Sequence, residues 1–321
     1  MGIIKSIKPA CLCVAWIMTT LFEGGYANAK GNVALTSEQD LGVELTSEQV
    51  VSSRKEALSS SSGTVVFEAG VYRGTLKQPD NTRWIAEPGA IVRGQLVAGK
   101  GSLVSGFDVS GGRVGVVCRS NSVCRNLNVH HNSQSGIHVG SDGVKLIRNR
   151  VHDNNLDLRP VVRGNPCWNS AGIHMVLGNQ VVLRGNRVIH NGCDGIHADI
   201  GMRYGRFKNN VVKRNTRFGI FIETSCDQKV KRNKFKRNRA GVYIGNSPRI
   251  KVMKNSFRRN GLGIVWHDRV RVTMLPDRSS ANRGVSEAAD PGAIAFMGTG
   301  LSVRLKQPVD GLTGHGGSKF E

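Results

Sequence analysis

A six-residue pattern, N-x-[VF]-x-x-N, recurs through the middle of this sequence. Its copies are NRVHDN (149–154), NRVIHN (186–191), NVVKRN (210–215), NKFKRN (233–238) and NSFRRN (255–260). After a short gap each copy is followed by a Gly and a β-branched residue, and these Gly recur at intervals of 23, 24, 22 and 22 residues. Such a period, with short alternating runs between turn residues, indicates a solenoid in which each repeat forms one coil of strands.

The repeat predicts an all-β fold, a single-stranded right-handed parallel β-helix. Leucine-rich repeats have a similar period, but their leucine framework is absent here. In a β-helix, equivalent residues of successive coils stack about 4.8 Å apart. Stacked Asn can hydrogen-bond along the column and tolerate left-handed turns, and Gly suits the bends. The predicted inward columns are Leu146, Leu183, Phe207, Val230, Val252; Val151, Val188, Val212, Phe235, Phe257; and Ile173, Ile196, Ile220, Val242, Ile264.

The segments outside the repeat give the expected domain organisation. Residues 1–29 have two lysines, a short apolar run (CLCVAWIMTTLF) and an ANA cleavage site, as in a signal peptide. Residues 30–62 are expected to form a linker and a capping helix over LTSEQVVSSRKEAL (45–58), and 268–321 an irregular C-terminal cap and tail. No later segment is long and apolar enough to span a bilayer. We therefore expect an exported protein, in which Cys118 and Cys124 could close a small loop.

The chain is strongly basic, with a formal net charge of +22. Residues 203–259 hold 18 Lys and Arg against Glu223 and Asp227, which indicates an acidic partner. In the predicted coils the cations stack as Lys145, Arg206, Lys229, Lys251; as Lys208, Lys231; and as the doublets Lys213/Arg214, Lys236/Arg237 and Arg258/Arg259. Like charges in register destabilise a sheet unless an anion compensates. We expect a linear polyanion along the helix axis, an acidic polysaccharide rather than nucleic acid.

Titratable residues gather on one outward column. Alternation places His138, His174, His197, Phe221, Tyr243 and Val265 in that column, with Asp199 and Glu223 two residues further along their strands. Asp194, Asp199 and Glu223 could hold calcium, or one carboxyl could stay protonated as a general acid. His174 and His197 could form half of a transition-metal site, or a base with its partner.

An insertion interrupts the repeat just before His174. Eighteen positions separate the motif from the following Gly172 where other coils have about four, and the extra segment is NLDLRPVVRGNPCWNS (155–170). Long insertions on a solenoid usually build the walls of a binding face. Arg159 and Arg163 could bind carboxylates there, and Trp168 could stack on a sugar ring.

Two stretches carry a resemblance to a known family. GTVVFEAGVYRGTLKQPDNTRWIAEPGAIVRGQ (63–95) resembles the opening coils of pectate-lyase-like β-helix proteins, and the resemblance covers roughly 63–267. DGIHAD (194–199) loosely resembles the calcium-binding run of pectate lyases and a GIDPHD-like run of alginate epimerases, while Pro160 and Arg163 match part of an RxPxxR motif. The resemblance implies an acidic, uronate-type polysaccharide as substrate, and a lyase or C5-epimerase activity.

Abstraction of the uronate C5 proton needs a base, a proton donor and a group that neutralises the carboxylate. Our hypothesis gives these roles to His197 as base with His174 as its partner, Tyr243 as donor, and Arg163 or Arg217 as the carboxylate clamp. The residues expected to bind substrate are Arg159, Trp168, His138, Phe221, Lys213 and Lys236, and those expected to bind calcium are Asp194, Asp199 and Glu223.

Two other functions fit the same residues. Asp199 and Glu223 could hydrolyse a glycoside, as in β-helix polygalacturonases, whose NTDG is partly matched by GCDG (192–195). Alternatively the chain is a non-catalytic periplasmic or surface module that binds a polyanion or a metal. The periplasmic accessory protein for copper-site assembly in nitrous oxide reductase has similar repeats.

Overall fold

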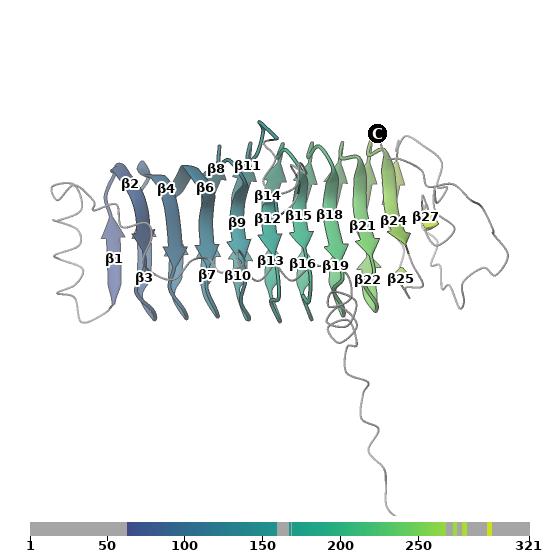
Figure 1. The fold of residues 1–321 in the computed structure, drawn as a ribbon, viewed down its shortest axis with the longest axis horizontal. Coiled ribbons are helices and arrows are strands. Elements are labelled where there is room, and N and C mark those ends of the chain that lie inside the picture. Colours follow the sequence, from purple (N-terminus) through teal and green to yellow (C-terminus); the bar gives the residue numbers. More distant parts are fainter. Residues whose placement is uncertain are drawn as a thin grey trace, which may run out of the picture. The chain divides into compact units, whose positions relative to one another are not determined.

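The computed structural model describes residues 63–158, 167, 169–267 and three short strands beyond them, 272–274, 278–280 and 294–296. The expected signal peptide, linker and capping helix lie outside the described residues, as does most of the expected tail. Within the described part no helix is present, and the strands stack coil upon coil (Figure 1). No helix there is long and apolar enough to cross a membrane. The domain boundaries stay predictions.

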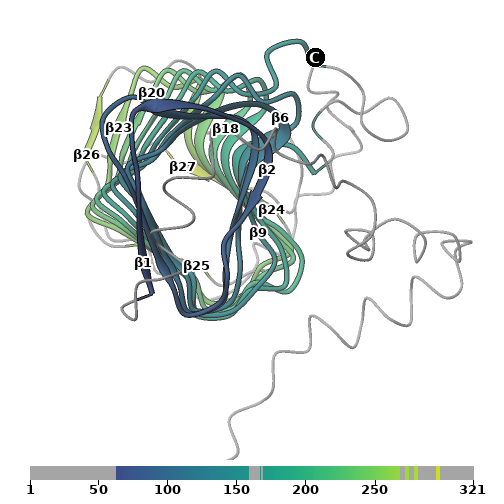
Figure 2. The ribbon, with the colours of Figure 1, turned by 90° about the vertical axis from the view of Figure 1, so that its left-hand side faces the viewer.

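The coils superpose into three faces, which Figure 2 shows along the stack. Face one is a parallel sheet of ten strands. These are β1 (Thr64–Phe67), β3 (Arg83–Ala86), β5 (Leu103–Ser105), β7 (Val123–Arg125), β10 (Lys145–Ile147), β13 (Val182–Arg184), β16 (Arg206–Lys208), β19 (Lys229–Lys231), β22 (Ile250–Met253) and β25 (Val272–Met274). Every neighbouring pair in this sheet is parallel, as the repeat predicted.

Faces two and three belong to one sheet that bends. Its first strands cross both faces: β2 (Gly70–Lys77), β4 (Ala90–Ala98) and β6 (Asp108–Cys118). Face two continues with β8 (Asn128–His130), β11 (Arg150–His152), β14 (Arg187–Ile189), β17 (Val211–Lys213), β20 (Lys234–Lys236), β23 (Ser256–Arg258) and β26 (Arg278–Ser280). Face three continues with β9 (Ser135–Val139), β12 (Ala171–Met175), β15 (Asp194–Ala198), β18 (Phe218–Glu223), β21 (Ala240–Gly245) and β24 (Leu262–His267), and β27 (Ile294–Phe296) pairs antiparallel to β24.

Two asparagine ladders tie the coils together at the corners of face two. In one, Nδ2 of each Asn donates to Oδ1 of the next, through Asn132, Asn154, Asn191, Asn215, Asn238 and Asn260. The other joins Asn149, Asn186, Asn210, Asn233 and Asn255 in the same way. The predicted ladders are confirmed, but these Asn are not the left-handed residues. The residue before each takes that conformation, as at Arg148 (φ 56°) and Asp153 (φ 54°).

The three predicted inward columns form the core and are confirmed. Their side chains are at most 2% exposed, and they pack as one continuous cluster with the Val, Leu and Phe of the first coils. A second, smaller cluster lies outside face three, where Phe221, Tyr243 and Val265 pack together. Between described residues, disulfides join the suggested pair Cys118–Cys124 and also Cys167–Cys193, whose Cα atoms lie 5.5 Å apart.

Candidate functional site

The histidine column of face three has the register predicted from the repeat. His138 pairs with His174, His174 with His197, and the column continues through Phe221, Tyr243 and Val265. The rings stack in sequence, with centroids 5.3 Å apart for His138–His174, 5.4 Å for His174–His197 and 4.6 Å for His197–Phe221. Although their side chains lie on the outer side of the sheet, away from the core, His174 and His197 are only 2% and 4% exposed.

His174 is held between a histidine and an aspartate. Its Nδ1 lies 3.2 Å from Nδ1 of His138, and its Nε2 lies 3.4 Å from Oδ2 of Asp199. Burial lowers the pKa of His174 more than the bond to Asp199 raises it. Burial and the nearby His174 also lower the pKa of His138, to about 4. Both rings are therefore neutral at neutral pH.

His197 has three carboxylates around it. Its Nε2 lies 3.2 Å from Oε2 of Glu223 and 3.9 Å from Oδ1 of Asp199. Its Nδ1 is buried 3.9 Å from Oδ2 of Asp194, and neither atom has a hydrogen-bond partner within the described residues. Burial alone would lower the pKa of His197, but the bond to Glu223 and the acidic charges outweigh it and raise the pKa. His197 therefore favours the imidazolium form.

Asp194 is fully buried and turned toward Arg217. Its Oδ1 accepts bonds from Nε of Arg217 and from the backbone N–H of Phe218, both at 3.1 Å. Burial raises the pKa of Asp194, although the Arg217 charge acts in the opposite direction. The guanidinium also lies over the Phe218 and Phe221 rings, 4.7 and 5.0 Å from their centroids. Arg217, expected as the substrate clamp, is thus engaged by the chain itself.

The donor set can be compared with the expected calcium site. One ligand atom each from His174, His197 and Asp199 lies within 4.8 Å of the others, the only such group of three or more among the described residues. Two imidazoles and a carboxylate suit a transition metal, whereas calcium takes oxygen ligands only. Of the three acids expected to bind calcium, only Asp199 belongs to this group, and calcium binding stays a prediction.

The other predicted residues divide between locations. Phe221 lies between His197 and Tyr243 in the column, and the ring centroids of Phe221 and Tyr243 are 5.2 Å apart. The expected proton donor is therefore two coils away from His197. Lys213 and Lys236 pair with each other on face two, not on the histidine face. Arg159, Arg163 and Trp168 lie outside the described residues.

The described ends of the insertion lie against the start of β15. The Cys167–Cys193 disulfide fixes one end beside Asp194. At the other end, Nδ2 of Asn155 donates to Oγ of Ser170 at 2.7 Å and lies 3.4 Å from Sγ of Cys193. Both anchored ends of the insertion therefore lie beside the strand that carries His197, and its expected role as the wall of a binding face stays a prediction.

Comparisons with known proteins identify the fold family. A family model described as "Right handed beta helix region" matches residues 94–260 and 207–283. The chain belongs to the right-handed β-helix family. The A-module of mannuronan C-5 epimerase AlgE6 from Azotobacter vinelandii is 15% identical, with a TM-score of 0.52 over 71% of this chain and 79% of that one. No curated protein sequence matches this chain.

A second β-helix of similar structure is tailspike protein 2 of an Escherichia coli O157:H7 bacteriophage. It is 13% identical, with a TM-score of 0.51 over 67% of this chain. The present chain spans only 34% of that protein. At these identities the likeness shows a shared β-helix architecture, which confirms the predicted handedness and fold.

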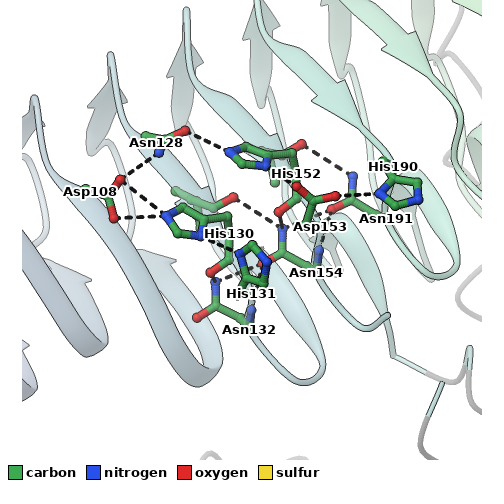
Figure 3. Close-up of polar contacts among 12 residues, drawn as sticks. Asp108, Asn128, His130, His131, Asn132, His152, Asp153, Asn154, His190 and Asn191 are labelled. Atoms are coloured by element: carbon green, nitrogen blue, oxygen red, sulfur yellow. Dashed lines mark hydrogen bonds and ion pairs between the residues drawn. The ribbon is translucent and has the colours of Figure 1, made fainter. Parts of the chain in front are cut away.

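This β-helix carries a second group of titratable residues, which sequence reasoning missed. It lies on face two and contains Asp108, Asn128, His130, His131, His152, Asp153 and His190 (Figure 3). A signal was present, because NRVHDN and NRVIHN place Asp153 and His190 at the same motif position. Arg214, Arg237 and Arg259 occupy this position in the later copies. A comparison of this position across all copies would have shown a row of charged or titratable residues and so indicated the group.

Proposed function

We propose that this protein acts on an acidic, uronate-type polysaccharide by transfer of the C5 proton, as a lyase or C5-epimerase. One observation carries the proposal: His174 and His197 favour opposite protonation states and converge with Asp199 within 4.8 Å. A neutral imidazole can accept a proton and an imidazolium can donate one. This spacing suits two groups that act on neighbouring atoms of one sugar ring.

The electrostatics favour roles in the opposite order to the sequence hypothesis. His174 is the neutral ring and is proposed as the base, whereas His197 is the charged ring and is proposed as the donor. Asp199 keeps its charge because, although burial raises its pKa, the bond to His174 and the His197 charge lower the pKa overall. An ionised Asp199 could serve hydrolysis only as the nucleophile or base, so the general acid would have to be Glu223. Glu223, with a side chain 43% exposed, marks the open side of the cluster.

The proposed reaction balances without a cofactor. His174 takes the C5 proton, and the electron pair of the C5–H bond forms a C4–C5 double bond as the C4–O4 bond breaks. His197 gives its proton to the departing O4. In an epimerase the C4–O4 bond stays intact and a proton returns to the opposite side of C5. Positive charges are needed near the uronate carboxylate in both reactions, and the basic columns of this chain provide that environment.

The purified protein should be incubated with polygalacturonate, alginate and a neutral glucan, with calcium and then with chelator. Ultraviolet absorbance reports a new double bond, and proton exchange at C5 in deuterated water reports epimerisation. His174→Gln and His197→Gln should each abolish turnover, while Lys229→Gln on face one serves as a matched surface control. Turnover that persists in both histidine variants, or absence of any reaction on either polyuronate, would contradict the proposal.

The histidine–aspartate group also favours a second candidate function, binding of a transition metal. His174, His197 and Asp199 supply two imidazoles and a carboxylate, a set typical of zinc, copper or nickel sites. Calorimetry with Zn²⁺, Cu²⁺ or Ni²⁺ should show one tight site in the wild type and none in His174→Gln. Binding without turnover would make the protein a metal-binding module.

Export belongs to the same proposal. Residues 1–29 have the charge, apolar run and small-residue site of a signal peptide. An acidic polysaccharide outside the cytoplasm would then meet the mature chain. N-terminal sequencing of protein recovered from the producing cell's periplasm or medium should begin at residue 30, whereas an intact N-terminus would contradict export by cleavage.

A further inference from the structure

One outward column of face two runs through nine successive coils. We call it the face-two column, and its members are Arg73, Arg93, Ser110, His130, His152, Ile189, Lys213, Lys236 and Arg258. At about 4.8 Å per coil it is roughly 40 Å long. Both ends are basic, and histidines occupy the centre. The basic run seen in the sequence is therefore only one end of a longer surface.

The C-terminal end of the column carries cations with no internal counter-ion. Beside Lys213, Lys236 and Arg258 stand three corner arginines in the left-handed conformation, Arg214, Arg237 and Arg259. None of these six side chains takes part in an ion pair with the described residues. Loss of hydration, followed by repulsion from its basic neighbours, lowers the pKa of Lys236. An external anion would relieve this repulsion.

The centre of the column is a hydrogen-bonded network (Figure 3). Asp108 lies 3.0 Å from Nε2 of His130 and accepts a bond from Nδ2 of Asn128 at 2.6 Å. That bond turns Oδ1 of Asn128 toward Nε2 of His152, 3.0 Å away. Nδ1 of His152 lies 2.5 Å from Asp153. His152 needs a proton on both nitrogens to make both contacts, but burial lowers the pKa of this ring more than the bond to Asp153 raises it. The network is therefore complete only when His152 takes up a proton in acid.

The network continues to the corner between faces two and three. The other oxygen of Asp153 bonds Nδ1 of His190, whose side chain is 56% exposed, and Nδ1 of His131 lies 2.6 Å from Nδ1 of His130. Ile189 is the one apolar member of the face-two column. His190 follows it directly in the chain and places an imidazole beside this position. Four imidazoles thus share two carboxylates.

Protonation changes the sign of the net charge of this network. With its histidines neutral the network carries the two negative charges of Asp108 and Asp153. Because the contact between the Nδ1 atoms of His130 and His131 needs one of them as acceptor, at most three rings are imidazolium, and the network then carries one positive charge. The other charged groups on the same face, from β4, β11, β14 and β17, are Arg93, Arg150, Arg187 and Lys213, and all are basic. Histidine is the side chain whose charge ordinarily changes between pH 5 and 8. Protonation of the network therefore joins the two basic ends into one cationic track.

We propose that the face-two column binds a linear acidic polysaccharide along the helix axis, and that protonation of its central histidines tightens this binding. The occupant is inferred from charge: a polymer with one carboxylate on each sugar presents a regular row of anions to a regular row of cations. The inference rests on the proposed function for the class of polymer. The proposed binding surface lies on the face next to the group of His174, His197 and Asp199 on face three. Binding to it does not require turnover.

Binding of a fluorescently labelled oligogalacturonate should be measured by anisotropy at pH 5.5 and 8.0 at constant ionic strength, since its carboxylates stay ionised at both. The wild type should bind about tenfold more tightly at pH 5.5, as expected for a few additional surface ion pairs. His152→Gln/His190→Gln should lose most of this ratio, and the single His190→Gln, at an exposed position, should lose part of it.

Two lysine pairs provide matched controls with equal charge loss. Lys213→Gln/Lys236→Gln should weaken binding several-fold at both pH values and leave the ratio unchanged, whereas Lys77→Gln/Lys100→Gln, at exposed positions outside the basic columns, should have little effect. Suppose that turnover is observed. If the wild type then binds equally tightly at both pH values, or if the histidine variant keeps the wild-type ratio of affinities, this inference alone is overturned. A histidine-dependent ratio without turnover would support it and refute the proposed catalysis. No binding at either pH would refute both.

Discussion

Gly195 is a position where the addition of a single methyl group should cause a large loss of stability. It lies in β15 between Asp194 and Ile196, in the Gly column that the repeat revealed. A Cβ at this position would come within 2.6 Å of Nδ2 of Asn215, 2.6 Å of Cγ1 of Val212 and 2.8 Å of the carbonyl oxygen of Gly219. The φ angle of Gly195 is not in the left-handed region, so close approach rather than backbone freedom requires Gly there.

The cost of Gly195→Ala follows from these three contacts. The Gly219 oxygen belongs to the neighbouring strand and cannot move without breaking the sheet, and overpacking of this kind costs about 1–3 kcal/mol. Displacement of Asn215 also weakens its ladder bond to Asn238, which contributes about 0.5–1.5 kcal/mol. We therefore expect Gly195→Ala to lower the free energy of unfolding by about 2–4 kcal/mol.

Gly245→Ala in β21 is the matched control on the same face. A Cβ there would meet only the Phe221 and Tyr243 rings, both at 3.7 Å, which is ordinary contact. Urea unfolding followed by circular dichroism should give Gly245→Ala a midpoint near that of wild type. For a slope of about 2–3 kcal/mol per molar urea, the Gly195→Ala midpoint should fall by roughly 1 M. Equal midpoints for the two variants would refute the close-approach reasoning.

Three further predictions concern acid, charge and redox. The pKa of His138 is lowered from 6.5 to about 4, so between these pH values the unfolded chain binds more protons than the folded chain. The free energy of unfolding should therefore fall by about 3 kcal/mol as the pH drops through this interval. Urea titrations should show that His138→Gln removes this loss. Arg217→Gln should cost about 3–5 kcal/mol by leaving Asp194 buried without its partner, and adding Asp194→Asn should recover much of it. Replacing Cys167 and Cys193 by Ser should lower the free energy of unfolding by about 3 kcal/mol, measured by the same method.

The fold could be predicted because each repeat position has one physical task. Ile196 and its equivalents fill the core, and Asn215 and its equivalents bond along the ladder, so five copies constrain the same solution. The left-handed turn was assigned to the wrong residue. Asn alone suggests that conformation from its residue type, whereas the structure gives it to Asp153 and His190, which precede the ladder Asn.

The candidate site was only partly predictable for a different reason. Register follows from the repeat, so the pairing of His174 with His197 could be read from sequence. The direction of a side chain does not follow from the repeat. The carboxylate of Asp194, for example, points toward Arg217 and not toward Asp199. Burial was also hidden, because a residue outside a sheet can still be covered, and burial decides which histidine holds a proton.

The corner between faces two and three carries charged or titratable side chains at left-handed positions. His131, Asp153, His190, Arg214, Arg237 and Arg259 all take left-handed φ angles between 51° and 57°. That conformation costs an ordinary residue about 1–2 kcal/mol and costs Gly nothing comparable. The other corner of face two has the same conformation and mixes residue types, with Arg148, Arg232 and Lys254 as well as Gly185 and Asn209. Charged side chains therefore occupy strained turns on both sides of face two, and this concentrates positive charge on the face where we propose that a polyanion binds.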